Sequence, residues 1–453
     1  MALKAIGNII RIEELRNRLL YTLALLGVYR LGVFINTPGV DRSALQAVMQ
    51  EQSRGGGLIQ LFNFFSGGAL DQMSIFGLGV MPYVSASIIM QLLTVVIPSL
   101  ERLQKEGAGG RQKINQYTRY ATIALALVQG FGVTRIMASY GRSADAQSSG
   151  IAHIVVPKDD FWFVAMTMIT LAAGTAFIMW LGERITERGI GNGISLIIFA
   201  GIAARLPASG KMLFDEVFPS SGEGTLSPGA LIALLAFMVL AIGVVVYVER
   251  GMRRIPIQYA KRMAGRQMFA GQATYFPVKV NGAGVIPPIF ASALLSFPAT
   301  LATFLPFMGN VQQAIQSSSW IYNGLFVGLI IFFAYFYTSL TFRPDDVADN
   351  IKKQGGYIPG IRPGKQTAEF IERVLNRLTF GGGIYLATIC VIPSLITSLV
   401  SVQLYFGGTA LLIVVGVALD TVQQIEQHLI SRNYEGFAGP RGPRIRGRIR
   451  MAA

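Results

Sequence analysis

The stretch from Phe62 to Pro98 is an apolar segment of unusual length. It contains 37 residues and a single charged side chain, Asp71. As one helix it would measure about 55 Å, whereas the hydrocarbon core of a bilayer is about 30 Å thick. Two crossings need about 40 residues plus a turn, so the stretch is too short for two. We therefore expect a short apolar piece that enters the membrane and stops, followed by one full span.

Helix-breaking residues within the same stretch support this division. Gly67, Gly68, Gly77, Gly79 and Pro82 lie where a smooth helix would need helix formers. Irregular backbone at membrane depth is stable only inside protein or beside a water-filled cavity. The pattern is therefore typical of the interior of a channel or a transporter.

The composition identifies the whole chain as a membrane protein. Of the 453 residues, 52% are hydrophobic and 14% are charged, whereas soluble domains carry about 25% charged residues. Residues 1–18 are charged and amphipathic and lack the apolar core of a signal peptide, so no cleavable signal is expected. Ten segments are long and apolar enough to span a bilayer, at about residues 19–36, 76–97, 118–138, 161–181, 191–206, 229–248, 282–304, 320–342, 381–401 and 407–428.

The distribution of charge predicts the topology. With a cytoplasmic N-terminus and residues 62–98 counted as one crossing, 31 of the 39 Lys and Arg residues fall on the cytoplasmic side. Seven fall on the opposite side, and Arg30 lies within the first span. This is a strong positive-inside pattern. Counting residues 62–98 as two crossings reverses the pattern for the later loops, so we expect one crossing preceded by an external re-entrant piece.

Two connections are long, and both are predicted to be cytoplasmic. Residues 249–281 carry seven basic side chains, and residues 343–380 carry seven more among Gly/Pro turns and a short amphipathic stretch at 370–378. The charges either only orient the protein or bind an anionic partner such as ribosomal RNA or an acidic protein face. Residues of the β-forming type and turn residues favour ordered loops that project into the cytoplasm. The arginine-rich tail at residues 441–450 suits anionic lipid headgroups or RNA.

The spans contain few groups capable of chemistry. Arg30 and Asp420 are the ionisable residues within them, and both are explained by snorkelling toward the membrane surface. An ion-coupled transporter needs buried carboxylates near the midplane, and an enzyme needs catalytic groups. Neither is evident, so a channel is favoured, a secondary transporter with inverted repeats remains the alternative, and no enzymatic activity or cofactor is expected. The Gly-Ile-Gly-Asn-Gly run at 189–193 lacks the lysine of a phosphate-binding loop and is better explained by the start of a helix and tight packing.

A short motif occurs twice. Residues 79–87 read GVMPYVSAS and residues 284–292 read GVIPPIFAS. They lie in the second and seventh predicted spans, which are equivalent positions of two five-span halves with opposite directions. An inverted-topology repeat has this pattern, with a pathway at the repeat interface, although chance similarity among small residues and prolines is the competing explanation. A proline inside each helix would favour a bend, and the neighbouring Val and Ile residues would form a narrow apolar constriction.

With these features, the chain resembles the SecY family of protein-conducting channels over nearly its whole length. The resemblance rests on eight stretches: FNFFSGGAL at 62–70, MPYVSASIIMQLL at 81–93, KINQYTRY at 113–120, MWLGERITERGIGNGISLII at 179–198, VERGMRR at 248–254, residues 282–293, YIPGIRPGKQT at 357–367 and YFGGTALLIV at 405–414.

The resemblance implies an all-α membrane protein. Ten transmembrane helices in two inverted five-helix halves would surround an hourglass pore. A re-entrant plug half-helix at about residues 58–72 would close the pore from outside, with Phe62, Phe64, Phe65, Gly67, Gly68 and Asp71 among its residues. The pore ring would consist of Val80, Val84, Ile198, Ile289 and Ile413. Valine at two ring positions, where the family is isoleucine-rich, would make the seal slightly looser. A lateral gate to lipid would lie between spans 2–3 and 7–8.

The resemblance also implies partners and a location. The chain would pass unfolded polypeptides across the cytoplasmic membrane and release hydrophobic segments, signal sequences included, into lipid. Its partners would be the small membrane subunits SecE and SecG, the motor ATPase SecA and the ribosome. The docking residues would be Arg362, Lys261, Arg262, Arg266, Arg253 and Arg254. It would be a multi-pass protein of the inner membrane with both termini cytoplasmic.

The expected domain organisation follows from the spans. It comprises a cytoplasmic N-terminus at 1–18, an N-terminal half at 19–206, an external hinge loop at 207–228, a C-terminal half at 229–428 and a basic cytoplasmic tail at 429–453.

Overall fold

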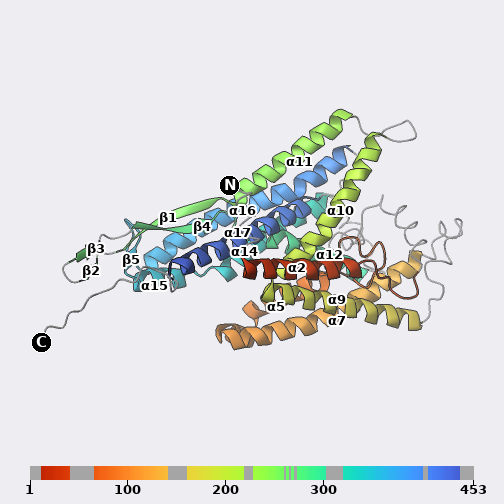
Figure 1. The fold of residues 1–453 in the computed structure, drawn as a ribbon, viewed down its shortest axis with the longest axis horizontal. Helices are drawn as coiled ribbons and strands as arrows, with labels where there is room; N and C mark the ends of the chain where they lie inside the picture. Colours follow the sequence, from red (N-terminus) through yellow and green to blue (C-terminus); the bar gives the residue numbers. More distant parts are fainter. Residues whose placement is uncertain are drawn as a thin grey trace.

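The fold is a helical bundle with a small, partly β-stranded projection at one end (Figure 1). The computed structural model describes residues 12–40, 66–140, 161–218, 228–259, 262–264, 267–269, 273–302, 320–400 and 407–438. Each of the ten predicted spans coincides with a helix. In chain order these helices are α2 (Glu13–Gly32), α5 (Met81–Val96), α7 (Ala108–Tyr140), α9 (Phe161–Arg188), α10 (Gly193–Val217), α11 (Pro228–Glu249), α12 (Ile286–Ala302), α14 (Trp320–Thr341), α16 (Lys365–Val400) and α17 (Gly408–Ala438).

By length and hydropathy alone, some of these helices qualify as membrane spans. Within the described residues, six helices are long and apolar enough to cross a membrane, and a bent pair would make a seventh. The pair consists of α5 and the short α6 (Pro98–Lys105), which meet at an angle of 99°. The chain turns because Ile97 is extended and Pro98 starts the next helix, where its missing N–H costs nothing. On α6, the hydrogen bond from the Lys105 ammonium to the Glu101 carboxylate lowers the pKa of Glu101.

The structure corrects four local expectations. Pro82 and Pro287 do not bend helices from within, because α5 and α12 begin only one residue before them. The segment 207–217, expected in an external hinge loop, continues α10 through Pro207. The amphipathic stretch at 370–378 and the ninth span form one helix of 36 residues. The last helix extends to Ala438, ten residues into the expected tail, whereas the arginine-rich segment 441–450 lies outside the described residues.

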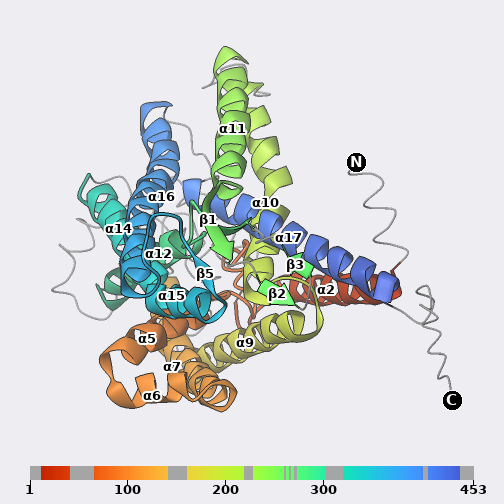
Figure 2. The same ribbon diagram turned by 90° about the vertical axis from the view of Figure 1, so that its left-hand side faces the viewer.

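The ten helices form two groups of five that meet along two seams. In the N-terminal half α5 packs on α7 and α7 on α9, and in the C-terminal half α12 packs on α14 and α14 on α16. The halves contact each other mainly through α5 with α12 and through α10 with α17. Figure 2 shows α5, α7 and α9 on one side of the molecule and α11, α14 and α16 on the other. One continuous cluster of buried side chains crosses both seams.

The two long loops form a second, separate core. Strand β1 (Met252–Tyr259) pairs with β4 (Ala273–Lys279) and with β5 (Gly356–Tyr357), and β2 (Arg262–Ala264) pairs with β3 (Gln267–Phe269) beyond them (Figure 1). Helix α15 (Pro344–Lys353) packs beside β5 and α16. The buried residues Ile255, Ile257, Val278, Ile351, Ile358 and Ile371 join these elements. The expectation that both loops are ordered is confirmed for their described residues, and their position on the cytoplasmic side stays a prediction.

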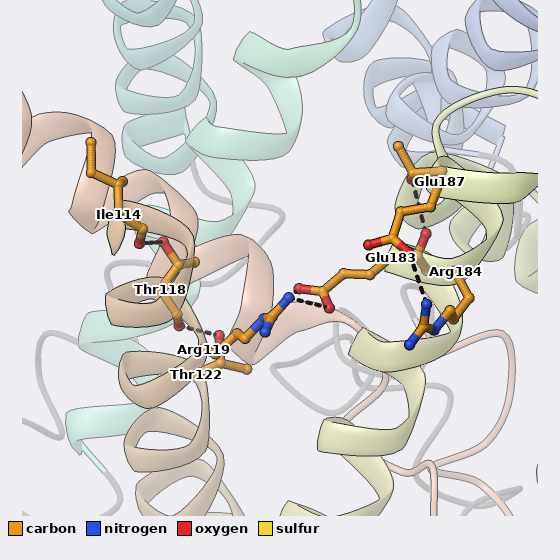
Figure 3. A network of polar contacts seen from close by, with 9 residues as sticks. Ile114, Thr118, Arg119, Thr122, Glu183, Arg184 and Glu187 are labelled. Carbon is orange, nitrogen blue, oxygen red and sulfur yellow. Dashed lines mark hydrogen bonds and ion pairs between the residues drawn. The ribbon is translucent and has the colours of Figure 1, made fainter. Parts of the chain in front are cut away.

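A forked ion pair ties two helices of the N-terminal half together. Arg119 on α7 donates from Nε and Nη2 to the two carboxylate oxygens of Glu183 on α9, each over 2.8 Å (Figure 3). Such a bidentate pair constrains orientation as well as distance. The pair therefore fixes how α7 and α9 face each other at this point.

Candidate channel interior

The five predicted ring residues lie on the two seams between the halves. Val80 and Val84 belong to the start of α5 and Ile289 to α12, which form one seam, whereas Ile198 on α10 and Ile413 on α17 form the other. All five are at most 8% exposed and belong to the same buried cluster. The five residues therefore share one apolar interior built from four helices, and their role as a pore ring stays a prediction.

The two copies of the repeated motif have the same backbone path. Gly79 and Gly284 both have left-handed φ angles, of 56° and 62°. Two residues later α5 and α12 begin, and each has a proline at its second position. Proline favours the first turn of a helix, and glycine tolerates a left-handed angle. The repeated Gly-Val-x-Pro is thus a device that starts a helix inside the bundle rather than one that bends it.

The described part of the predicted plug, from Ser66 to Gln72, crosses α10 at close range. A Cβ added to Gly67 would lie 2.5 Å from the Cα atom of Gly201 on α10, so the two backbones touch there. A Cβ added to Gly79 would lie 2.9 Å from the Cα atom of Ser66. The segment therefore covers the start of α5 directly. Phe62, Phe64 and Phe65 lie outside the described residues.

Polar groups from two helices hold this segment. The Tyr29 hydroxyl of α2 donates to the carbonyl oxygen of Ser66 over 3.1 Å, and Arg30 donates to that of Gly67 over 3.5 Å. Arg205 on α10 forms an ion pair of 2.7 Å with Asp71. Asp71 thus belongs to a specific contact, and Arg30 reaches a backbone carbonyl of the segment.

The segment is followed by a short backbone pairing that sequence reasoning missed. Thr37 N–H donates to Met73 O over 2.8 Å, and Ile75 N–H donates to Ile35 O over 2.9 Å. Met73 has a φ of 43°, the one left-handed non-glycine residue in the part of the chain that the structure describes. Tyr29 and Gly201 were also missed, because an aromatic residue and a glycine within apolar spans carry no signal that separates contact with a distant loop from ordinary packing.

The glycine-rich run at 189–193 is a tightly packed helix start, as expected. The Asn192 side chain accepts hydrogen bonds from the N–H groups of Ile194 and Ser195 and so caps α10. The Ile190 N–H donates to the Thr22 hydroxyl on α2, and the Gly191 N–H donates to Gln424 on α17. The run therefore joins three helices at one end of the bundle.

The predicted docking residues lie on the projection where the structure describes them. Arg253 and Arg254 are exposed on β1, opposite Val278 and Pro277 of β4. Arg362 is exposed in the turn between β5 and α16, and its carbonyl oxygen accepts a hydrogen bond from the Thr367 hydroxyl. Arg262 belongs to β2. Lys261 and Arg266 lie outside the described residues.

The described side chains offer no metal centre. No group of three or more His, Cys, Asp or Glu residues within the described ranges has the arrangement of a metal site. Cys390 is buried in the apolar cluster, consistent with a packing role.

Comparisons with known proteins agree with this architecture. The sequence profile of the SecY family matches residues 74–422. The protein translocase subunit SecY of Pseudomonas aeruginosa is 47% identical over 442 residues, covering 96% of both chains. That of Streptomyces galbus is 47% identical over 449 residues, covering 96% of this chain and 99% of the relative.

Solved structures share the fold at low sequence identity. A structure described as a protein conducting channel superimposes with a TM-score of 0.60 at 19% identity, covering 93% of this chain and 94% of that one. Sec61 in the canine ribosome-channel complex gives a TM-score of 0.57 at 18% identity with the same coverage. These likenesses fit the ten-helix, two-half bundle, and the names of the curated relatives support a translocase subunit rather than the transporter alternative. The match of the family profile to most of the chain, and 47% identity over nearly its full length, establish this protein as a member of the SecY family.

Proposed function

We propose that the chain forms the protein-conducting channel of a translocase, through which unfolded polypeptides cross the cytoplasmic membrane. The observation that carries the proposal is the ring of Val80, Val84, Ile198, Ile289 and Ile413, buried together on the two seams between the halves. An unfolded chain has no fixed shape, so its pore cannot depend on a specific binding pocket. Aliphatic side chains conform to any passing residue and disfavour water and ions when they close again.

The plug residues block this ring from outside in the resting channel. The close contact of Ser66 with Gly79 and of Gly67 with Gly201 supports this role, because a segment at these positions covers the start of α5. A translocating chain has to displace the segment before it passes the ring.

The seam between α5 and α12 acts as the lateral gate. Its two helices start inside the bundle at equivalent motifs and belong to different halves, so a small separation of the halves opens it toward lipid. A hydrophobic segment in the pore then leaves through the gate, because lipid solvates apolar surface better than water by about 25 cal/mol per Å².

The energy for transport comes from partners. The basic projection docks the motor ATPase SecA and the ribosome through Arg362, Arg253, Arg254 and Arg262, with Lys261 and Arg266 contributing. The small subunits SecE and SecG accompany the chain. Both termini are cytoplasmic in the inner membrane. The functional division follows the two five-helix halves, from α2 to α10 and from α11 to α17.

Deleting residues 62–72 tests the proposal. The resting ion conductance of channels reconstituted in planar bilayers should rise several-fold above that of the wild type. The matched control is a replacement of the same residues by a Gly/Ser sequence of equal length, which keeps the connection but removes the plug side chains and should leak as well. Unchanged conductance in both variants would mean that the segment merely packs.

A further inference from the structure

The ion pair between Asp71 and Arg205 joins the plug segment to helix α10, 134 residues away in the sequence. We propose that this pair is the closed-state latch of the channel, and that Arg205 is the positioning residue that sets how readily the plug segment leaves. The inference rests on the plug role proposed above and adds the residue pair that controls it. Its consequence is selectivity: a strong signal sequence opens the latched channel and a weak one does not.

The geometry of the pair is built into both elements. Gly67 and Gly201 touch backbone to backbone, and Asp71 and Arg205 each lie four residues further along their own segment. Residues four apart share one face of a helix, so Gly201 and Arg205 present a small residue and then a cation to the crossing segment. The Arg205 side chain runs past Gly68, where an added Cβ would lie 3.4 Å from its Nε atom. The Arg205 side chain therefore lies along the plug segment, and its guanidinium forms the ion pair with the Asp71 carboxylate at 2.7 Å.

The pair differs in kind from the other contacts that hold the segment. Tyr29 and Arg30 donate to the backbone carbonyl oxygens of Ser66 and Gly67, which any sequence supplies. The contact of Arg205 with Asp71 depends on two side chains of opposite charge. Both are partly exposed, with 28% and 33% of the side chain accessible, so water screens the attraction. A bond of this strength biases the segment toward the closed position and still breaks during normal opening.

The backbone pairing of Ile35 and Thr37 with Met73 and Ile75 begins two residues after Asp71. It remains a fixed attachment when the ion pair breaks, since it consists of backbone hydrogen bonds between segments on either side of the plug. The ion pair lies two residues before this attachment. Its loss weakens the hold of α10 on the segment, whose buried Ala69 and Leu70 still have to leave the core before the segment moves away.

The test measures resting conductance and export by the full translocase with its partner subunits in lipid vesicles. Asp71→Asn and Arg205→Gln should each raise the resting leak about threefold to tenfold, because losing about 1 kcal/mol of closed-state preference changes a population by that order. Both variants should also export a precursor with a weakened signal sequence faster than the wild type does. Arg205→Lys should restore most of the closure, and the exchanged pair Asp71→Arg with Arg205→Asp should leak less than either of its single substitutions.

The matched control is Arg135→Gln, at the same side of the membrane on α7, where the guanidinium stacks on Phe131 of its own helix. It should leave both readouts at wild-type values. The thermal stability of the purified complex should be the same for Asp71→Asn and the control, which separates a latch from a general structural contact.

Two outcomes would overturn the inference. If the deletion of residues 62–72 leaks but Asp71→Asn and Arg205→Gln do not, the plug role stands and the latch is wrong. If the charge variants leak and the exchanged pair is no tighter than its single substitutions, each residue acts by itself and the pair is not the latch. If the deletion itself leaves conductance unchanged, the proposed plug function fails first, and that result is distinguishable from both.

Discussion

Helices α5 and α12 start with the same backbone motif, but different residues pack against the two helix starts. Both have a left-handed glycine followed two residues later by a helix with proline in its first turn. At Gly79 an added Cβ would meet the backbone of Ser66, whereas at Gly284 it would meet nothing within 4 Å. The start of α12 is held instead by the buried Asn281, which bonds both the N–H and the carbonyl oxygen of Gly284 and the carboxylate of Glu249.

The difference shows how two equivalent halves acquire different tasks. In each half, the connection before the motif joins the first and second spans. In the N-terminal half this connection packs against α10 and the start of α5, and in the C-terminal half it forms the β1–β4 hairpin. The repeated motif therefore starts a helix in each half, and the two halves differ in the connection that precedes it.

The largest effect is expected from Gly79→Ala compared with Gly284→Ala. Each substitution places a side chain in a left-handed conformation, at a cost of about 1–2 kcal/mol, so both should lower the thermal stability of the purified complex. Only Gly79→Ala also pushes Ser66 away, and it should raise the resting conductance about fivefold or more. Equal conductance of the two variants would show that α5 and α12 are not covered differently where they begin.

A second prediction concerns the basic projection of the C-terminal half. Arg362→Glu reverses a charge on the projection, and we expect motor-driven export to fall roughly threefold to tenfold because an anionic partner is repelled. Resting conductance and membrane insertion should remain normal, in contrast to the plug variants. The matched control is Arg373→Glu, which alters an exposed charge on the following helix. Export at the normal rate would mean that the charge at position 362 serves orientation only.

The smallest effect is expected from exchanging Val and Ile at the equivalent motif positions of α5 and α12. Val84 occupies the motif position that corresponds to Ile289, so Val84→Ile adds one methyl group to the ring. In channels lacking residues 62–72, it should lower the leak about twofold to fourfold, because a buried methylene contributes about 0.8 kcal/mol. Ile289→Val should raise the leak in the same background. A leak that rises with Val84→Ile, or falls with Ile289→Val, would show that these two side chains do not form the seal.

The sequence predicted the number and order of the spans because these depend on local signals. Apolar segments located all ten spans, the Lys and Arg distribution favoured a re-entrant piece, and Asn192 among glycines indicated a capped helix start. The effect of the prolines was predicted wrongly because it depends on where the helix starts. The preceding left-handed glycine ends the earlier segment, so that each helix begins one residue before its proline. The continuation of α10 through Pro207 went unpredicted for a related reason, since proline usually ends a helix.

The contacts around the plug segment were beyond sequence reasoning. Tyr29, Gly201 and Arg205 meet the segment from positions 37 to 134 residues away. Nothing in their own neighbourhoods shows this, because packing partners across a fold depend on the path of the chain and not on local pattern. The ring residues were placed through the family resemblance, since single Val and Ile residues in apolar spans look like any lipid-facing residue.

Site-specific photo-crosslinking to a stalled, translocating polypeptide tests the central claim most directly. Photoreactive residues at positions 84 and 289 replace side chains buried on the seam between α5 and α12, and residues at 89 and 294 serve as controls on the exposed faces of the same helices. We predict adducts with the polypeptide from positions 84 and 289 during active export and few or none from positions 89 and 294. An absence of adducts from 84 and 289, or equal adducts from all four positions, would contradict a pore between the two halves.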